Sequence, residues 1–170
     1  MKYLLHLKTI IIHKWYVGLE CFKHGLYWQG IVHDLSKFSY IEFFYSAQYF
    51  NGTSTPIGRE KAEKGYSLAW LNHKAKNKHH WEYWTDFYSG VIKPVPIPEK
   101  YIKEMACDMI GASKTYNKMS YRNGMAWEYF NERRDQFIMT DESKTSLEKY
   151  LCKYEALDDT LTIINSIFKE

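Results

Sequence analysis

The chain has 170 residues and a formal net charge of +3, which is enough length for one domain with a substantial core. So small a positive charge excludes the dense basic surface of a dedicated nucleic-acid binder. The three cysteines form no C-x-x-C pair and leave an odd count, which is typical of buried thiols in a reducing compartment. No stretch approaches the roughly 18 apolar residues of a membrane span. We therefore expect a cytoplasmic protein of one domain, with no membrane partner and no nucleic acid as a dedicated partner.

Apolar residues recur at steps of three and four through residues 2–24, which predicts one long helix. They are Leu4, Leu5, Leu7, Ile11, Ile12, Trp15, Leu19 and Phe22. His13 stands beside this apolar face, where a histidine is either a core residue or a ligand. His24-Gly25 ends the helix, because glycine readily adopts the left-handed cap conformation.

A second helix is expected over about residues 26–36, and it carries the dipeptide His33-Asp34. Neutral imidazole and carboxylate are ligands that Zn, Mn, Fe and Ni accept. Because neighbouring helical side chains point about 100° apart, the pair serves either two adjacent ions or one ion whose shell is completed by other helices. A third helix follows over about residues 40–50, and its start, Ser39-x-x-Glu42, fits the capping-box pattern. The capping role already explains why a glutamate stands at position 42.

Residues 51–58 are rich in Gly, Ser, Thr and Pro and form a loop. A helix then runs from about Arg59 to His73, and three histidines stand within His73–His80. In a continuous helix, His73 and His80 share one face, whereas a break at Asn77 makes His79 equally suitable as a ligand. The alternative is a solvated basic helix end, with the intervening lysines facing water.

The segment 93–98 carries three prolines and stops any helix. An amphipathic helix is expected from Glu99 to Tyr116. Asp108 lies near its inward face, where a lone carboxylate is costly to bury and needs a cation, a set of hydrogen bonds or a metal. Glu104, one turn earlier, is a candidate partner of the same site.

Beyond residue 117 we expect a short helix at 126–134 and a final helix that starts at Thr140. Leu147, Leu151, Tyr154 and Leu157 form one stripe of that helix, and Asp158-Asp159 restart a tail helix. No strand is expected. Aromatic residues make up 18% of the chain, which favours a thick aromatic core. Together with the C-terminal stripe, this aromatic content also favours a homodimer.

The ordered set of these residues, H…HD…H…H…D, resembles the HD-domain superfamily of metal-dependent phosphohydrolases. The phrases A-W-L-N-H-K, N-K-H-H-W-E-Y-W and E-M-A-C-D-M-I-G-A-S-K are also similar to a small set of uncharacterised bacterial and phage proteins with an HD-like core. The resemblance implies an all-α fold, a compact helical bundle of about six to eight helices. It covers roughly residues 10–118, so the single domain 1–170 would add C-terminal helices over 119–170 to this core.

The resemblance also implies a cofactor of one or two divalent transition metals, which would be Mn, Fe, Ni or Zn. The expected ligands are His13, His33, Asp34 and Asp108 for one ion, with His73 and either His80 or His79 for a second. In the superfamily, the lysine of an H-D-x-x-K segment often approaches substrate phosphate, and Lys37 matches it.

The expected function is hydrolysis of a phosphate ester, on a nucleotide or a small phosphorylated metabolite. Asp34 would bridge two ions and orient the attacking water, while Lys37 would neutralise phosphate charge. Lys74 or Lys78 would help at the mouth of the site, and Trp81 would either stack on a base or pack. Two alternatives stay open on the same scaffold. One is a non-haem di-iron oxygenase, and the other is a degenerate HD fold that serves as a non-enzymatic binding protein.

Overall fold

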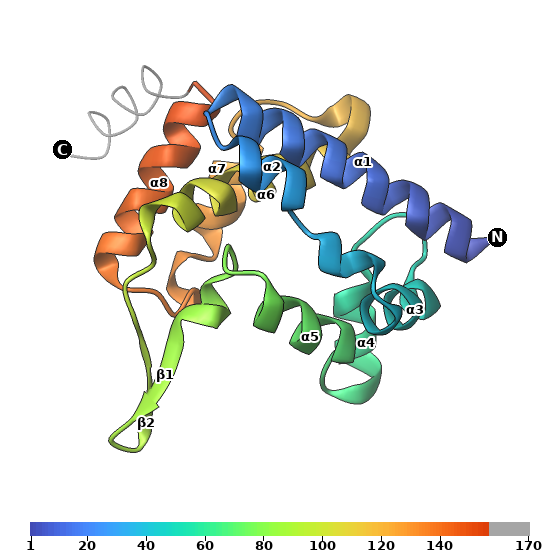
Figure 1. Ribbon diagram of the computed structural model, residues 1–170, viewed down its shortest axis with the longest axis horizontal. Helices are drawn as coiled ribbons and strands as arrows, with labels where there is room; N and C mark the ends of the chain where they lie inside the picture. The colour runs from blue at the N-terminus through green and yellow to red at the C-terminus, as the bar shows by residue number, and fades with distance from the viewer. Residues whose placement is uncertain (157–170) are drawn as a thin grey trace.

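The computed structural model describes residues 1–156 and consists almost wholly of helices, in agreement with the predicted all-α fold (Figure 1). The described part of the chain contains eight α-helices, four short 3-10 helices and one two-stranded hairpin. The α-helices are α1 (Lys2–Lys23), α2 (Tyr27–Val32), α3 (Tyr40–Tyr49), α4 (Pro56–Lys64), α5 (Leu68–Lys76), α6 (Glu99–Asn117), α7 (Met125–Glu132) and α8 (Asp141–Tyr154). The 3-10 helices are η1 (Leu35–Phe38), η2 (Trp81–Trp84), η3 (Lys118–Ser120) and η4 (Arg134–Gln136).

Short polar side chains set the starts of four helices, as local sequence rules require. The hydroxyls of Ser39, Thr55, Ser67 and Thr140 accept hydrogen bonds from the first turns of α3, α4, α5 and α8. Gly65, at φ 80°, ends α4, because only a residue without Cβ takes this left-handed conformation easily. The single helix expected from Arg59 to His73 is therefore two helices, and the first begins at Pro56.

The strands β1 (Thr85–Tyr88) and β2 (Val91–Pro94) pair in antiparallel register, with Tyr88 opposite Val91. The expectation that the chain forms no strand is wrong here. The turn residues Ser89 and Gly90 both have positive φ, which is the geometry of a tight hairpin turn. The hairpin projects from the helical body (Figure 1).

Helix α6 is the element against which both halves of the molecule pack, since it contacts α1 on one side and α8 on the other. The larger apolar cluster lies between α6, α7 and α8, and its fully buried members include Ile110, Phe130, Leu147 and Leu151. The C-terminal stripe is thus part of the core in its described portion. Leu157 and the expected tail helix at 158–170 lie outside the described residues.

The interior between α1, α3, α5 and α6 is largely polar. Three histidines and three carboxylates are buried in this interior, and they come from all four helices and from the loops between them. They are His13, His33, Asp34, Glu42, His73 and Glu104. Burying such groups is costly unless they compensate one another or bind a ligand. No helix of the described residues is long and apolar enough to cross a membrane.

Helices α1 and α6 approach most closely at Gly111, where a Cβ atom would lie 2.9 Å from the backbone nitrogen of Val17. Because that atom belongs to the backbone, the Gly111→Ala variant must push the two helices apart. We expect Gly111→Ala to lower the free energy of unfolding by about 1–3 kcal/mol, measured by urea denaturation.

Gly58→Ala is the matched control, because Gly58 is also helical but a Cβ atom added to it would have no neighbouring atom within 4 Å. Replacement of an exposed helical glycine by alanine should raise the free energy of unfolding by up to about 1 kcal/mol. Equal effects of the two variants would contradict a close contact between α1 and α6.

Candidate metal centre

Asp34 lies at the centre of the polar interior, and its backbone is unusual. Helix α2 ends at Val32, so the expectation that His33 and Asp34 sit within a helix is wrong. His33 caps α2 in an extended conformation, and Asp34 takes the left-handed conformation, with φ 55° and ψ 24°, before η1 begins. Aspartate tolerates this conformation better than most residues do. The break turns both side chains toward the same interior point, which two adjacent residues of one helix could not do.

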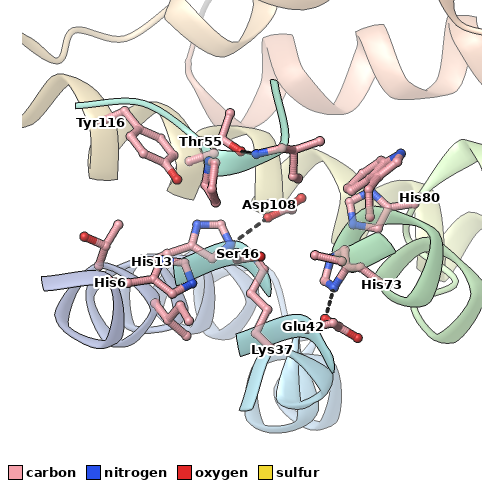
Figure 2. A pocket seen from close by; sticks show the side chains of 17 residues that line it. His6, His13, Lys37, Glu42, Ser46, Thr55, His73, His80, Asp108 and Tyr116 are labelled. Carbon is pink, nitrogen blue, oxygen red and sulfur yellow. Dashed lines mark hydrogen bonds and ion pairs between the residues drawn. The ribbon is translucent and has the colours of Figure 1, made fainter. Parts of the chain in front are cut away.

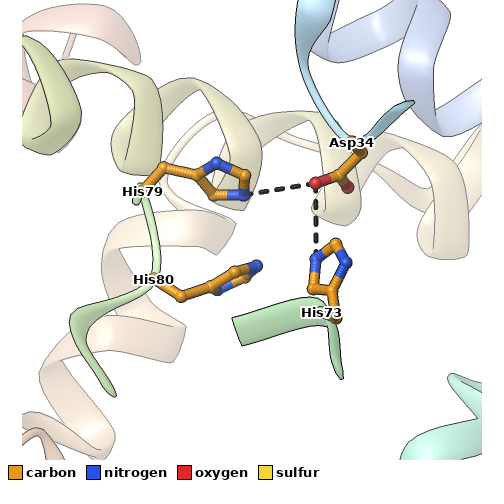
Figure 3. A group of neighbouring side chains, drawn as sticks. All are labelled: Asp34, His73, His79 and His80. Carbon is orange, nitrogen blue, oxygen red and sulfur yellow. Dashed lines mark ion pairs between the residues drawn. The ribbon is translucent and has the colours of Figure 1, made fainter. Parts of the chain in front are cut away.

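The two carboxylate oxygens of Asp34 face different sets of histidines. Oδ2 lies 3.4 Å from Nε2 of His13 and 3.2 Å from Nε2 of His33. Oδ1 lies 3.3 Å from Nε2 of both His73 and His79 (Figure 3). The carboxylate of Asp34 therefore stands between two groups of histidines, one at each of its oxygens.

Asp108 completes the first group from α6. Its Oδ1 lies 3.0 Å from Nε2 of His13 (Figure 2). The same oxygen lies 3.3 Å from Nε2 of His33. The ligand atoms of His13, His33, Asp34 and Asp108 all lie within 4.8 Å of one another. Divalent transition metals are commonly bound by four such nitrogen and oxygen atoms at this mutual spacing.

The second group comprises Asp34, His73, His79 and His80, again within 4.8 Å of one another. Asn77 caps the end of α5, so the helix does break where the sequence allowed a break. The loop that follows brings both His79 and His80 to the cluster (Figure 3). The structure thus includes both of the histidines between which the sequence left the choice open.

Carboxylates behind the histidines fix which ring nitrogen faces the cluster. Oε1 of Glu104 lies 3.1 Å from Nδ1 of His33 and 3.1 Å from Nδ1 of His79. Oε2 of Glu42 lies 2.7 Å from Nδ1 of His73. With Nδ1 facing a carboxylate, each ring turns its Nε2 inward, which is the usual support for a metal-bound histidine.

The assignment of Glu42 to helix capping alone is incomplete. Its backbone N–H does donate to Ser39, but its carboxylate turns to His73 and also accepts a hydrogen bond from Ser36. Asn77 donates to Ser36 in turn. No local sequence pattern predicts this network, because the hydrogen-bonded residues Glu42 and His73, and Ser36 and Asn77, are 31 and 41 positions apart in the chain.

Several buried atoms of the cluster make no hydrogen bond of good geometry among the described residues, although some lie 3.0–3.4 Å from another polar atom of the cluster. They are Nε2 of His13, His33, His79 and His80, and Oδ1 of Asp34. Unpaired buried acceptors are rare in proteins because each costs free energy. Their convergence from separate segments of the chain, together with the nitrogen and oxygen donor set, fits cations held between them.

The charges of the cluster shift one another's pKa values. Burial would lower the pKa of His33, but the nearby Asp34, Asp108 and Glu104 outweigh it and hold that pKa well above 6.5. At His79, burial and the charge of His33 lower the pKa, but Asp34 and Glu104 outweigh them and raise it to about 8. Burial raises the pKa of Asp34, yet His33, Lys37 and His73 together hold it well below its usual range. His80 differs, since burial and its neighbours His79 and His73 lower its pKa.

Two adjoining cavities open onto the cluster, with volumes of about 210 and 440 Å³. Both are lined by Trp70, His80, Asp108 and Tyr116. Their combined size is in the range of pockets that bind small organic ligands. Trp81 lines the larger cavity, whereas neither Lys74 nor Lys78 lines either one.

Lys37 is the one lysine or arginine among the described residues that line these cavities. Its ammonium lies 2.6 Å from Oδ2 of Asp34. Burial would lower its pKa, but the charge of Asp34 raises it, so the side chain is cationic at neutral pH.

His6 also lines the smaller cavity and was not a sequence candidate. Burial and then Lys37 lower the pKa of His6 to about 4, so it is neutral there.

The fold and site define an all-α protein with a buried cluster of five histidines and two aspartates beside a cavity. More particularly, the chain belongs to the family of unknown function DUF5662, whose model matches residues 2–153. A search of curated proteins gives no significant match. A search of solved structures gives none either.

The pKa values predict how the stability of the metal-free protein depends on pH. The pKa of His79, about 8 in the folded chain against 6.5 as its ordinary value, means that its charge stabilises the fold below pH 6.5. That contribution, about 2 kcal/mol, is lost as the pH rises through 8, and His33 acts in the same direction. His6 and His80 have lowered pKa values and act oppositely below pH 6.5. We therefore expect maximal stability near pH 6.5.

The measurement is urea unfolding in a chelating buffer from pH 5 to pH 9. His79→Gln should flatten the decline above pH 6.5 while leaving the rise below it. A wild-type protein whose stability does not change between pH 6.5 and pH 8.5 would contradict this assignment of charge.

Proposed function

We propose that the chain is a metal-dependent phosphohydrolase that acts on a nucleotide or a small phosphorylated metabolite. The observation that carries the proposal is the carboxylate of Asp34, shared between two histidine groups and adjacent to a single cavity lysine. The proposal agrees with the resemblance of the sequence to the HD-domain superfamily. The cytoplasm is the proposed location, since Cys21 and Cys107 are buried thiols.

Two divalent ions would fit between the residues described. His13, His33 and Asp108 would hold one, His73, His79 and His80 would hold the other, and Asp34 would be shared. Ions bound there supply Lewis-acid polarisation of a phosphoryl oxygen and a bound water of lowered pKa.

The residues of the chain supply the remaining parts of the reaction. The ammonium of Lys37 lies at the cavity wall, where it offsets negative charge on a phosphoryl group. One such cation suits a phosphomonoester better than a chain of phosphates, which would need more positive charge. Trp70, Trp81 and Tyr116 line the cavities beyond the cluster and exclude water from it. Their rings also give an aromatic or apolar leaving group a surface to pack on.

Metal content provides the first test. We expect two equivalents of transition metal in protein purified without chelator, measured by elemental analysis. His13→Ala and His80→Ala should each keep one equivalent, because each removes a ligand of one group only. Asp34→Ala should keep neither, since both groups share it.

His24→Ala is the matched control for these variants, because His24 stacks on Tyr154, with the ring centroids 3.4 Å apart, and does not belong to the cluster. It should retain both equivalents. Wild-type protein that takes up no Mn, Fe, Ni or Zn would overturn the enzymatic proposal and favour a non-enzymatic binding protein.

Activity provides the second test, with release of inorganic phosphate from a panel of phosphomonoesters as the readout. We expect Lys37→Gln to lower kcat/KM by about a hundredfold with metal content unchanged. Lys74→Gln should leave kcat/KM unchanged, since Lys74 does not line the cavities.

Metal-loaded protein that hydrolyses no phosphomonoester would contradict the proposal. Bound iron with near-ultraviolet and visible absorption, and consumption of dioxygen, would then favour the oxygenase alternative on the same ligands. Loss of metal in Lys37→Gln would show that Lys37 supports the ligands and would remove its assignment to phosphate.

A further inference from the structure

Helix α1 buries polar side chains and exposes large apolar ones, unlike an ordinary surface helix. The inward face carries His6, His13 and Glu20 as well as Ile10, Val17 and Cys21. The outward face carries Leu4, Ile11, Trp15, Leu19 and Phe22, all of them exposed. This outward face is the stripe whose periodicity predicted the helix, so the stripe is not part of the described core.

Helix α2 extends the apolar surface sideways. Its residues Tyr27, Trp28 and Ile31 are 64%, 70% and 55% exposed. The rings of Phe22 and Tyr27 are in contact, with centroids 5.8 Å apart. The ammonium of Lys14 donates to the carbonyl of Ile31 at 2.7 Å, which places the end of α2 beside the middle of α1. The outward residues of α1 and these three residues of α2 form one surface, called here the α1–α2 face.

The area of the α1–α2 face is large for a free surface. Trp15 is 65% exposed, and with Phe22, Tyr27 and Trp28 it leaves roughly 500 Å² of aromatic side chain in solvent. The aliphatic residues add about 300 Å², so the whole α1–α2 face exposes about 800 Å² of apolar area. The largest apolar patch of a typical monomer is smaller, about 300–600 Å². The total is close to the roughly 800 Å² that each partner contributes to a stable interface.

We propose that the α1–α2 face is the interface of a two-fold symmetric homodimer. An isologous contact pairs a surface with itself, and the stripe on α1 is about 30 Å long, which is enough to pair with a second α1. A two-fold axis across the middle of α1 makes the two helices antiparallel. The two copies of Lys8, the cation within the stripe, then lie toward opposite ends and do not face each other.

Charge argues for a second copy over an anionic lipid surface. Lipid binding by a basic segment takes a cluster of about four to eight lysines or arginines. Around the α1–α2 face, Lys23 is paired with Glu20 at 3.0 Å, and Lys14 is held by the carbonyls of Ile31 and His33. Lys2 donates to the carbonyl of Gln48 at 3.1 Å, so Lys8 is the one left among the lysines of α1, which is too few for such a cluster.

Sedimentation equilibrium of the full chain tests the proposal. We expect wild-type protein at twice the chain mass of 20.4 kDa. Ile11→Glu and Trp28→Glu, on different helices, should each raise the dimer Kd by about thirtyfold or more, and the double variant should be monomeric. Leu71→Glu is the matched control, since Leu71 is an exposed helical residue on α5, and it should remain dimeric.

Circular dichroism of each variant establishes that it is folded, because all three positions are exposed and tolerate a charge in the monomer. A wild-type chain that is monomeric at high concentration would overturn the proposal, and co-sedimentation of that monomer with anionic vesicles would assign the face to lipid. Dimers that persist in the folded double variant would also overturn it.

Discussion

The buried carboxylate of Asp34 is the constraint on which the N-terminal half of the molecule depends. A carboxylate in an interior is stable only among compensating charges or hydrogen bonds, and four histidines and Lys37 surround this one. Each of those histidines comes from a different place in the chain. Helices α1, α5 and α6 are placed so that their polar side chains meet at Asp34, whose left-handed backbone turns its carboxylate toward them. Glu42 and Glu104 hold the histidine rings in place from behind.

Two kinds of interior therefore coexist in the described chain. Between α6, α7 and α8 the interior is apolar, and packing area stabilises it. Between α1, α3, α5 and α6 it is polar, and electrostatic compensation stabilises it. Helix α6 belongs to both, with Ile110 turned to one and Asp108 to the other. The C-terminal helices add no side chain to the cluster, but they pack against α6, which carries Asp108 and Glu104.

Local rules predicted most of the helices, and non-local packing decided the rest. Ser39 and Gly25 mark helix ends through side-chain and backbone chemistry that acts within a few residues, so sequence suffices there. The inward face of α1 was not predictable in this way, because periodicity locates an apolar stripe without showing what it contacts. The break between Val32 and Asp34 is likewise set by the partners of Asp34, which are distant in sequence. Glu42 shows the same limit, since its role depends on His73 from another helix.

The separation of the two interiors has a consequence for the order in which the chain folds. Helices α6, α7 and α8 are close in sequence and share one apolar cluster, so they can collapse early. Helix α1 is synthesised before α6, yet its inward His13 finds its carboxylate partner on α6 only after residue 108 has been made. Helix α1, although synthesised before α6, is thus fixed after it. Until then its apolar outer stripe and its polar inner face are both in solvent, and the growing chain is exposed to non-native association.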